Sequence, residues 1–181
     1  MILSIIGFMG CGKSSVGSRL SELLCCSFID LDSVIEERYG RSIPEIFASD
    51  GEAAFRKMEK DVLESVFSIQ DTESPEPEQN FTAVLALGGG TVVTPECAEM
   101  VREKTKCIYL RASIDTLVSH LEGESSGRPM LHGGSLLRLK IENLMSLRSA
   151  TYENTAHIII DTDGKSVETI AQDIAERMSS H

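Results

Sequence analysis

A glycine-rich segment near the N-terminus constrains the fold of this chain more than any other feature. Residues 7–14 read Gly-Phe-Met-Gly-Cys-Gly-Lys-Ser and match the pattern G-x-x-x-x-G-K-[ST]. The segment follows an apolar run, Ile2–Ile6, of the kind that forms a strand buried on both faces. It precedes apolar residues at helical spacing over 14–24. The sequence therefore predicts a strand, a phosphate-binding loop and a helix in that order.

The residue types in this loop suit the binding of a nucleoside triphosphate. Glycines let the backbone curl so that its N–H groups face the phosphates, and the helix N-terminus adds positive potential. Lys13 would neutralise the β- and γ-phosphates, and the Ser14 hydroxyl would ligate Mg²⁺. The plain structural alternative is a glycine-rich turn between a strand and a helix, with an exposed lysine.

The remainder of the chain alternates between strand and helix patterns. Right-handed crossovers between parallel strands follow from such repeated units. We therefore predict an α/β three-layer sandwich with a central parallel sheet of about five strands, formed by one domain over residues 1–181. Further strands are expected at 27–31, 83–87, 107–110 and 157–160, and helices from the capping boxes at Ser33 and Ser42, over 52–67, after Thr94-Pro95 and over 136–152.

Two segments depart from the alternation. Residues 71–79 are acidic and contain two prolines, which is typical of a solvated loop insertion; binding of a partner is the alternative. Residues 122–134 are rich in Gly and Ser, and a loop this long inside a compact domain is usually mobile or functional.

Composition excludes several classes of protein. The net charge of −11 disfavours nucleic acid and anionic lipid as partners. The five cysteines are scattered without a CxxC pair, which indicates a reducing compartment and neither a disulfide framework nor a zinc site. There is no signal-peptide pattern at the start and no apolar run near the ~20 residues that span a bilayer. We expect a cytoplasmic protein.

Polar residues and glycines follow two of the later predicted strands. Asp30 and Asp32 lie two apart, so on an extended segment both carboxylates would face one site, where one could hold a metal and the other accept a proton. Alternatively, Asp32 only favours the start of the next helix. Residues 88–90 are three glycines where open α/β sheets place ligands, or else a plain loop. Taken singly, Arg56, Arg128 and Arg148 are more typical of solvated surface charges than of a binding role.

In combination, these features resemble the shikimate kinases over nearly the whole chain. Each motif is modest alone, but their order and spacing together are specific. The matching residues are Gly10-Cys-Gly-Lys13-Ser14-Ser15, Phe28-Ile-Asp30-Leu-Asp32 with Ile35-Glu36, Ile46-Phe47, Gly51-Glu52 with Phe55-Arg56 and Glu59, Leu87-Gly88-Gly89-Gly90, Arg128-Pro-Met-Leu131, and Arg148 with Tyr152.

The resemblance implies a P-loop kinase that uses one Mg²⁺ ion and transfers the γ-phosphoryl group of ATP to the 3-hydroxyl of shikimate. In that family Asp30 would belong to the Mg²⁺ shell together with Ser14, and Asp32 would bind the substrate hydroxyls and act as the base. Lys13, Asp32 and Arg128 would be the catalytic residues. The ATP-binding residues would be Gly10, Cys11, Gly12, Lys13, Ser14, Ser15, Arg128 and Lys165.

The resemblance also implies how the acceptor is held. Arg56 and Arg148 would pair with the shikimate carboxylate, because forked guanidinium groups bind carboxylates bidentately. The backbone of Gly88, Gly89 and Gly90 would assist, Glu59 would orient the pocket, and 122–134 would be a lid that excludes water and brings Arg128 to the transferring phosphoryl group. Nothing in the sequence requires more than a monomer.

Three features differ from the usual family pattern. His120 stands where an arginine often lies near the adenine, residues 161–166 lack the proline of the usual adenine loop, and the 71–79 insertion is long. The first two differences concern the adenine contacts, including the one implied for Lys165.

Other functions compatible with the phosphate loop make different demands. A related small-molecule kinase, such as a gluconate kinase, would phosphorylate a sugar acid in place of shikimate. A GTP-dependent switch would need a guanine-reading NKxD motif, which the sequence lacks. An inactive homologue would be expected to lose some of Lys13, Asp32, Arg56, Arg128 and Arg148, all of which are present.

Overall fold

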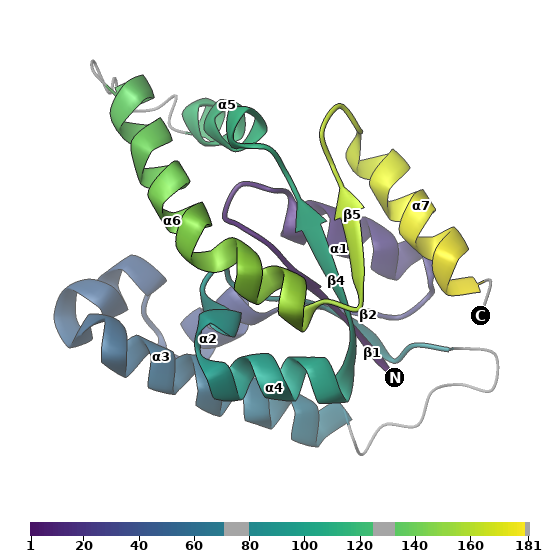
Figure 1. Ribbon diagram of the computed structural model, residues 1–181. Coiled ribbons are helices and arrows are strands. Elements are labelled where there is room, and N and C mark those ends of the chain that lie inside the picture. The colour runs from purple at the N-terminus through teal and green to yellow at the C-terminus, as the bar shows by residue number, and fades with distance from the viewer. Residues whose placement is uncertain (71–79, 125–132, 180–181) are drawn as a thin grey trace.

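The computed structural model describes residues 1–70, 80–124 and 133–179, and its five strands form one parallel sheet (Figure 1). The strand order is β2-β3-β1-β4-β5, and every neighbouring pair is parallel. The strands are β1 (Ile2–Ile6), β2 (Ser27–Asp30), β3 (Ala83–Ala86), β4 (Thr105–Arg111) and β5 (Ile158–Asp161).

The centre of the sheet is β1, which is buried along its whole length as its continuous apolar sequence predicts. Its one polar side chain, Ser4, is fully buried, and its Oγ lies 2.6 Å from the Thr105 Oγ1 on β4. This hydrogen bond satisfies both hydroxyls in the core.

Helices cover both faces of the sheet, which confirms the predicted three-layer α/β fold. In Figure 1, α1 and α7 lie together on one face, while α3, α4 and α6 lie on the other. A short 3₁₀ helix, η1 (Thr91–Val93), follows β3. The helices are α1 (Lys13–Leu23), α2 (Leu31–Tyr39), α3 (Ile43–Gln70), α4 (Pro95–Lys104), α5 (Ile114–Glu124), α6 (Gly133–Thr155) and α7 (Val167–Ser179). None of them, within the described ranges, has the length and hydropathy needed to cross a membrane.

The helix starts show which sequence signals were correct. The capping box at Ser42 is confirmed: the Ser42 N–H donates to the Glu45 Oε2 at 2.7 Å, and the Glu45 N–H donates to the Ser42 Oγ at 3.3 Å. The capping box at Ser33 is wrong. Helix α2 begins at Leu31, and the Asp30 side chain caps it by accepting the Ser33 N–H at 3.3 Å.

Helix α3 contains the two predicted helices in one element. They meet at Gly51, whose φ of 84° and ψ of 172° are not helical. Residues 122–134 were predicted to form a lid loop. Helix α5 includes residues 122–124, and helix α6 includes residues 133–134, so both ends of this segment are helical. Residues 125–132, with Arg128, and the acidic insertion 71–79 lie outside the described residues.

Candidate active site

The phosphate loop joins β1 to α1 at the carboxyl end of the sheet's central strand. Three of its glycines have positive φ: 151° at Gly7, 80° at Gly10 and 91° at Gly12. A Cβ at Gly7 would also lie 2.7 Å from the Leu110 carbonyl oxygen. Side chains would therefore strain the loop at these positions, which explains why its sequence is glycine-rich.

The ammonium of Lys13 lies over this loop. Its Nζ donates hydrogen bonds to the carbonyl oxygens of Gly7 at 2.8 Å and Phe8 at 2.9 Å. The neighbouring Cys11 is buried, and this burial raises the pKa of its thiol, so Cys11 is a neutral group in the loop. Positive charge at the loop therefore comes from Lys13 and the start of α1.

The Ser14 hydroxyl and the Asp30 carboxylate are in direct contact. The Ser14 Oγ donates to the Asp30 Oδ2 at 2.6 Å. Both residues line a cavity of about 270 Å³, together with Met9, Gly10, Gly12, Lys13, Ser15, Asp32, Leu87 and Gly89. The described residues contain no group of three or more His, Cys, Asp and Glu that could enclose a metal.

Asp30 and Asp32 face the same cavity for a different reason from the one predicted. Asp30 is the last residue of β2, whereas Asp32 lies in the first turn of α2, so the two are not on one extended segment. Burial raises the pKa of the Asp32 carboxyl to about 6, and the negative charges of Asp30 and Glu59 act in the same direction. Near neutral pH, Asp32 is therefore a carboxylate that readily accepts a proton.

A second cavity, of about 290 Å³, adjoins the first and shares Met9, Asp32 and Gly89 with it. It brings together residues from five parts of the chain, including both predicted substrate arginines. Its lining residues are Met9, Asp32, Ile43, Phe47, Glu52, Phe55, Arg56, Glu59, Gly88, Gly89, Gly90 and Arg148. Asp32 thus lies where the phosphate loop's cavity meets the arginine-lined one.

The carboxylate of Glu59 organises the second cavity although only 1% of Glu59 is exposed. Arg56 Nη1 donates to Glu59 Oε2 at 2.7 Å, and Thr91 Oγ1 donates to Glu59 Oε1 at 2.5 Å. Because each carboxylate oxygen has a partner, the buried charge is compensated and holds the Arg56 guanidinium in place. Sequence reasoning missed Thr91, since a threonine after a glycine triplet gives no local signal of this contact.

The glycine loop 88–90 packs closely against the same side chains. A Cβ at Gly88 would lie 2.9 Å from Asp32 Oδ1, and one at Gly90 would lie 2.7 Å from the Arg56 Cζ. From α6, the Tyr152 hydroxyl donates to the Gly89 carbonyl oxygen, and Arg148 Nη1 reaches the same oxygen at 3.5 Å. The hydroxyl contact of Tyr152 was not expected from the sequence.

The residues considered for the adenine are spread out. His120 Nδ1 lies 2.7 Å from the Gly10 carbonyl oxygen, so it contacts the phosphate loop directly. Lys165 follows β5, lines neither of the two cavities, and its backbone N–H donates to the Thr162 carbonyl oxygen at 3.1 Å. Arg128 falls outside the described residues.

Known proteins of one enzyme family are similar to this chain along nearly its whole length. The family model described as "Shikimate kinase" matches residues 9–179. The shikimate kinase of Dictyoglomus turgidum is 38% identical and covers 97% of this chain and 96% of its own; one from Thermus thermophilus is 36% identical over 99% and 90%. A structure of shikimate kinase from Acinetobacter baumannii in complex with shikimate has a TM-score of 0.82 and 29% identity, covering 99% of this chain and 93% of that one.

Proposed function

This chain belongs to the shikimate kinase family and phosphorylates shikimate with ATP, and we propose that the acceptor is the 3-hydroxyl, so that the products are shikimate 3-phosphate and ADP. The observation that carries the proposal is the pair of adjoining cavities, one formed by the phosphate loop and one lined by Arg56 and Arg148, with Asp32 in both. A kinase needs its donor and acceptor side by side, with a base at their boundary.

The first cavity is the proposed ATP site. Backbone N–H groups of the loop and the Lys13 ammonium would bind the β- and γ-phosphates. The residues that would contact ATP here are Gly10, Cys11, Gly12, Lys13, Ser14 and Ser15. Arg128 would add positive charge at the transferring phosphoryl group, and Lys165 would contact the base; both roles rest on the family resemblance.

Ser14 and Asp30 fit a single Mg²⁺ ion. They offer two hard oxygen donors close together, and Mg²⁺ usually takes one or two protein ligands and completes its shell with phosphate oxygens and water. When bound, the ion would neutralise charge on the phosphates. The carboxylate of Asp30 is already oriented for this by its bond to the first turn of α2.

The second cavity is the proposed acceptor site. Arg56 and Arg148 would bind the carboxylate of shikimate with forked hydrogen bonds, which overcomes the repulsion expected from a net charge of −11. Glu59 fixes Arg56, and Tyr152 fixes the carbonyl of Gly89, so the site is formed before substrate arrives. The side chains of Phe47 and Phe55, whose ring centroids are 4.6 Å apart, form an apolar wall.

Asp32 is the proposed general base. Its carboxylate would accept the proton of the attacking hydroxyl as the oxygen bonds to the γ-phosphorus and the bond to ADP breaks. A pKa raised to about 6 supports this role, because a base works best when its pKa lies near the operating pH.

We also propose that the protein acts in the cytoplasm as a monomer with neither nucleic acid nor membrane as a partner. The strongly negative net charge supports the last two points.

The test of the acceptor site uses Arg148→Ala, assayed against each substrate separately. We expect the KM for shikimate to rise by about two orders of magnitude, since an unpaired buried carboxylate costs a few kcal/mol, while the KM for ATP stays within about twofold. Lys140→Ala, on the same helix and exposed, is the matched control. An unchanged KM for shikimate in Arg148→Ala would contradict the assignment, and phosphorus NMR of the product would identify the hydroxyl that reacts.

A further inference from the structure

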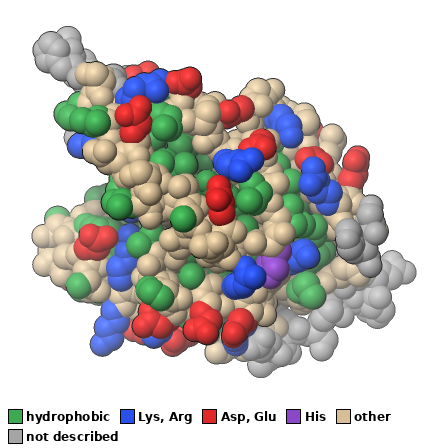
Figure 2. Space-filling view, viewed as in Figure 1, with side chains coloured by type: hydrophobic (Ala, Val, Ile, Leu, Met, Phe, Trp, Pro, Cys, Tyr) green, Lys and Arg blue, Asp and Glu red, His purple; other side chains and the backbone are tan. Residues whose placement is uncertain are grey.

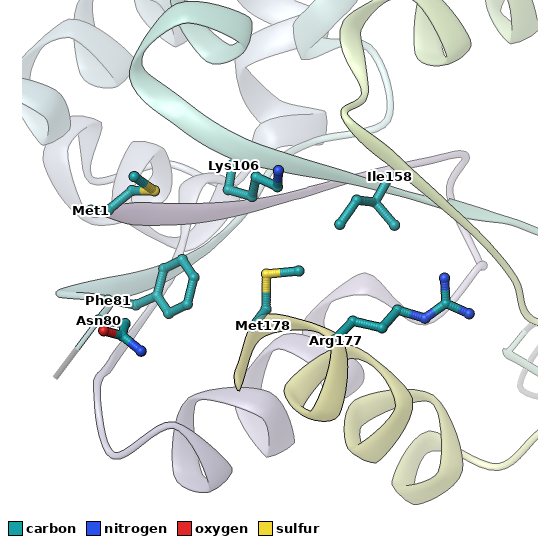
Figure 3. A pocket seen from close by; sticks show the side chains of 7 residues that line it. All are labelled: Met1, Asn80, Phe81, Lys106, Ile158, Arg177 and Met178. Carbon is teal, nitrogen blue, oxygen red and sulfur yellow. The ribbon is translucent and has the colours of Figure 1, made fainter. Parts of the chain in front are cut away.

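A third cavity, of about 580 Å³, lies at the opposite end of the sheet from the phosphate loop (Figure 3). It is lined where strands begin, whereas the active site is formed where they end. Its residues are Met1, Asn80, Phe81, Lys106, Ile158, Arg177 and Met178, and none of them lines either of the other two cavities. The third cavity is therefore separate from the kinase site.

The cavity has an apolar interior of a size that suits a small molecule. Small-molecule sites typically enclose about 300–1,000 Å³ and combine apolar walls with a few polar groups. Figure 3 shows Phe81 and Ile158 on either side of the hollow, with Lys106 above Met178 between them. Phe81 and Met178 are each only 8% exposed, so the walls on which a ligand would pack are held by the core.

Two cationic side chains, Lys106 and Arg177, line this hollow, and they differ in their partners. Within the described part of the chain, the Lys106 ammonium makes no hydrogen bond or ion pair. By contrast, Arg177 is paired with Asp173 at 2.9 Å. The side-chain charge available to a ligand in this cavity is therefore that of Lys106.

A neighbouring histidine reports the same positive potential. The His157 Nδ1 accepts the Cys107 N–H at 3.0 Å, which requires that nitrogen to be unprotonated. Burial lowers the pKa of His157, and the charges of Lys106 and Arg102 lower it further. Figure 2 shows Lys and Arg side chains on either side of a histidine on the drawn face. In a chain with a net charge of −11, the Lys106 ammonium would attract an anion to this cavity.

We propose that this cavity binds a small amphipathic carboxylate, with its aromatic or branched apolar body against Phe81, Ile158 and Met178 and its carboxylate on Lys106. The same lysine would repel a ligand that carries an ammonium group. A fully apolar ligand would leave the Lys106 ammonium without a partner. The proposal concerns a second ligand site and does not depend on the roles assigned to the kinase residues.

The absence of tryptophan from the chain allows a direct test. Asn80 is exposed and lines the cavity, so Asn80→Trp places a single indole there. Its fluorescence is titrated with 3-phenylpropionate, with the neutral 3-phenylpropan-1-ol and with acetate. We expect a saturable change with the carboxylate, binding about tenfold weaker for the alcohol, and no response to acetate, because both the charged contact and the apolar body contribute.

A second pair of variants assigns the contact. Lys106→Gln in the Asn80→Trp background should abolish the preference for the acid over the alcohol, whereas Lys140→Gln, which removes a distant exposed lysine, should preserve it. Saturating ATP and shikimate should leave the titration unchanged. Equal affinity for acid and alcohol, no effect of Lys106→Gln, or competition by either substrate would each overturn the proposal. Amide chemical shifts of the unsubstituted chain, expected to move at Phe81 and Ile158 on addition of 3-phenylpropionate, decide the matter if Asn80→Trp does not fold.

Discussion

The phosphate loop and the glycine loop 88–90 both use glycine to approach a ligand, but for different physical reasons. Gly10 and Gly12 have positive φ, and a Cβ at Gly12 would meet nothing within 4 Å, so backbone conformation alone requires glycine there. Gly88 and Gly90 do not have positive φ, and instead a Cβ at either would collide with the side chains of Asp32 or Arg56. Positive φ requires glycine throughout the first loop, with a close neighbour as well at Gly7, whereas at Gly88 and Gly90 only the neighbours require it.

This difference determines how each half of the site can be changed. The phosphate loop is local, since its ligand-facing groups are backbone N–H groups and residues within one short segment. The acceptor half depends on a buried network that joins α3, η1, the glycine loop and α6 through Glu59, Thr91 and Tyr152. Substitutions in the network should therefore raise the KM for shikimate and leave the KM for ATP unchanged.

The largest expected effect is that of Asp32→Asn, which removes the base shared by both halves. We expect kcat to fall by about 10²–10⁴ while ATP binding persists. Calorimetry measures ATP binding and steady-state kinetics measures kcat, so the two effects can be separated. Turnover close to that of the unsubstituted protein would eliminate Asp32 as the base.

The same variant should stabilise the fold without ligands. The folded pKa of Asp32, about 6, exceeds the ordinary value of 3.8, so ionisation is disfavoured in the folded state and stability is lost as pH rises from about 4 to 6. Asp32→Asn should therefore raise the free energy of unfolding by about 2 kcal/mol at pH 7.5 and by much less at pH 4. Urea unfolding at the two pH values measures this; a gain that is equal at both would contradict the raised pKa.

Glu59→Gln tests whether the buried carboxylate holds the acceptor half together. The glutamine keeps the shape but loses the charge that fixes Arg56, so we expect the KM for shikimate to rise about 10–100-fold and the KM for ATP to change little. Thr91→Val, which removes only one hydrogen bond to the same carboxylate, should give a smaller change in the same direction. If the two KM values rose equally, the halves would not be separable as described.

A pair of alanine substitutions sharpens the contrast between the loops. Gly12→Ala should destabilise the protein by about 1 kcal/mol, through strain at positive φ, and should raise the KM for ATP. Gly90→Ala should displace the Arg56 guanidinium, the far end of a flexible side chain, and so raise the KM for shikimate with a smaller loss of stability. Thermal unfolding and both KM values are measured for each variant; the reverse assignment of the two effects would refute the comparison.

The smallest expected effect is that of Tyr152→Phe. The ring would keep its packing on Tyr109, whose centroid is 5.1 Å away, but the hydrogen bond to the Gly89 carbonyl would be lost. We expect the KM for shikimate to rise about three- to tenfold with kcat within about twofold. A change in kcat alone would show that Tyr152 does not act through acceptor binding.

The sequence predicted the architecture because its signals are local and agree with one another. The buried run of β1, the glycine-lysine-serine loop and the periodic helix patterns each depend on neighbouring residues, and the five-stranded parallel sheet follows from their order. The helix start at Ser33 was wrong for a physical reason: the strand's last residue, Asp30, can cap the helix itself, so an equally good local cap was available three residues earlier.

The acceptor site was predictable only in part. The arginines and the glycine triplet were found through their combination, which resembles a known family. The contacts of Thr91 and Tyr152 were not, because they join residues 32 and 63 positions apart and no local pattern encodes them. Likewise, Asp32 was expected on an extended segment, yet it reaches the site from the first turn of a helix.

If one cavity binds ATP and the other selects shikimate as the acceptor, the purified protein should release ADP from Mg·ATP only when shikimate is present. Measuring ADP release tests this most directly. Shikimate, gluconate, quinate and no acceptor are compared side by side. The account predicts strong release with shikimate and only background release with the other three. No ADP release with shikimate, together with release in the presence of another acid, would contradict this prediction. That result would show that the phosphate loop was assigned correctly but the arginine-lined cavity was not.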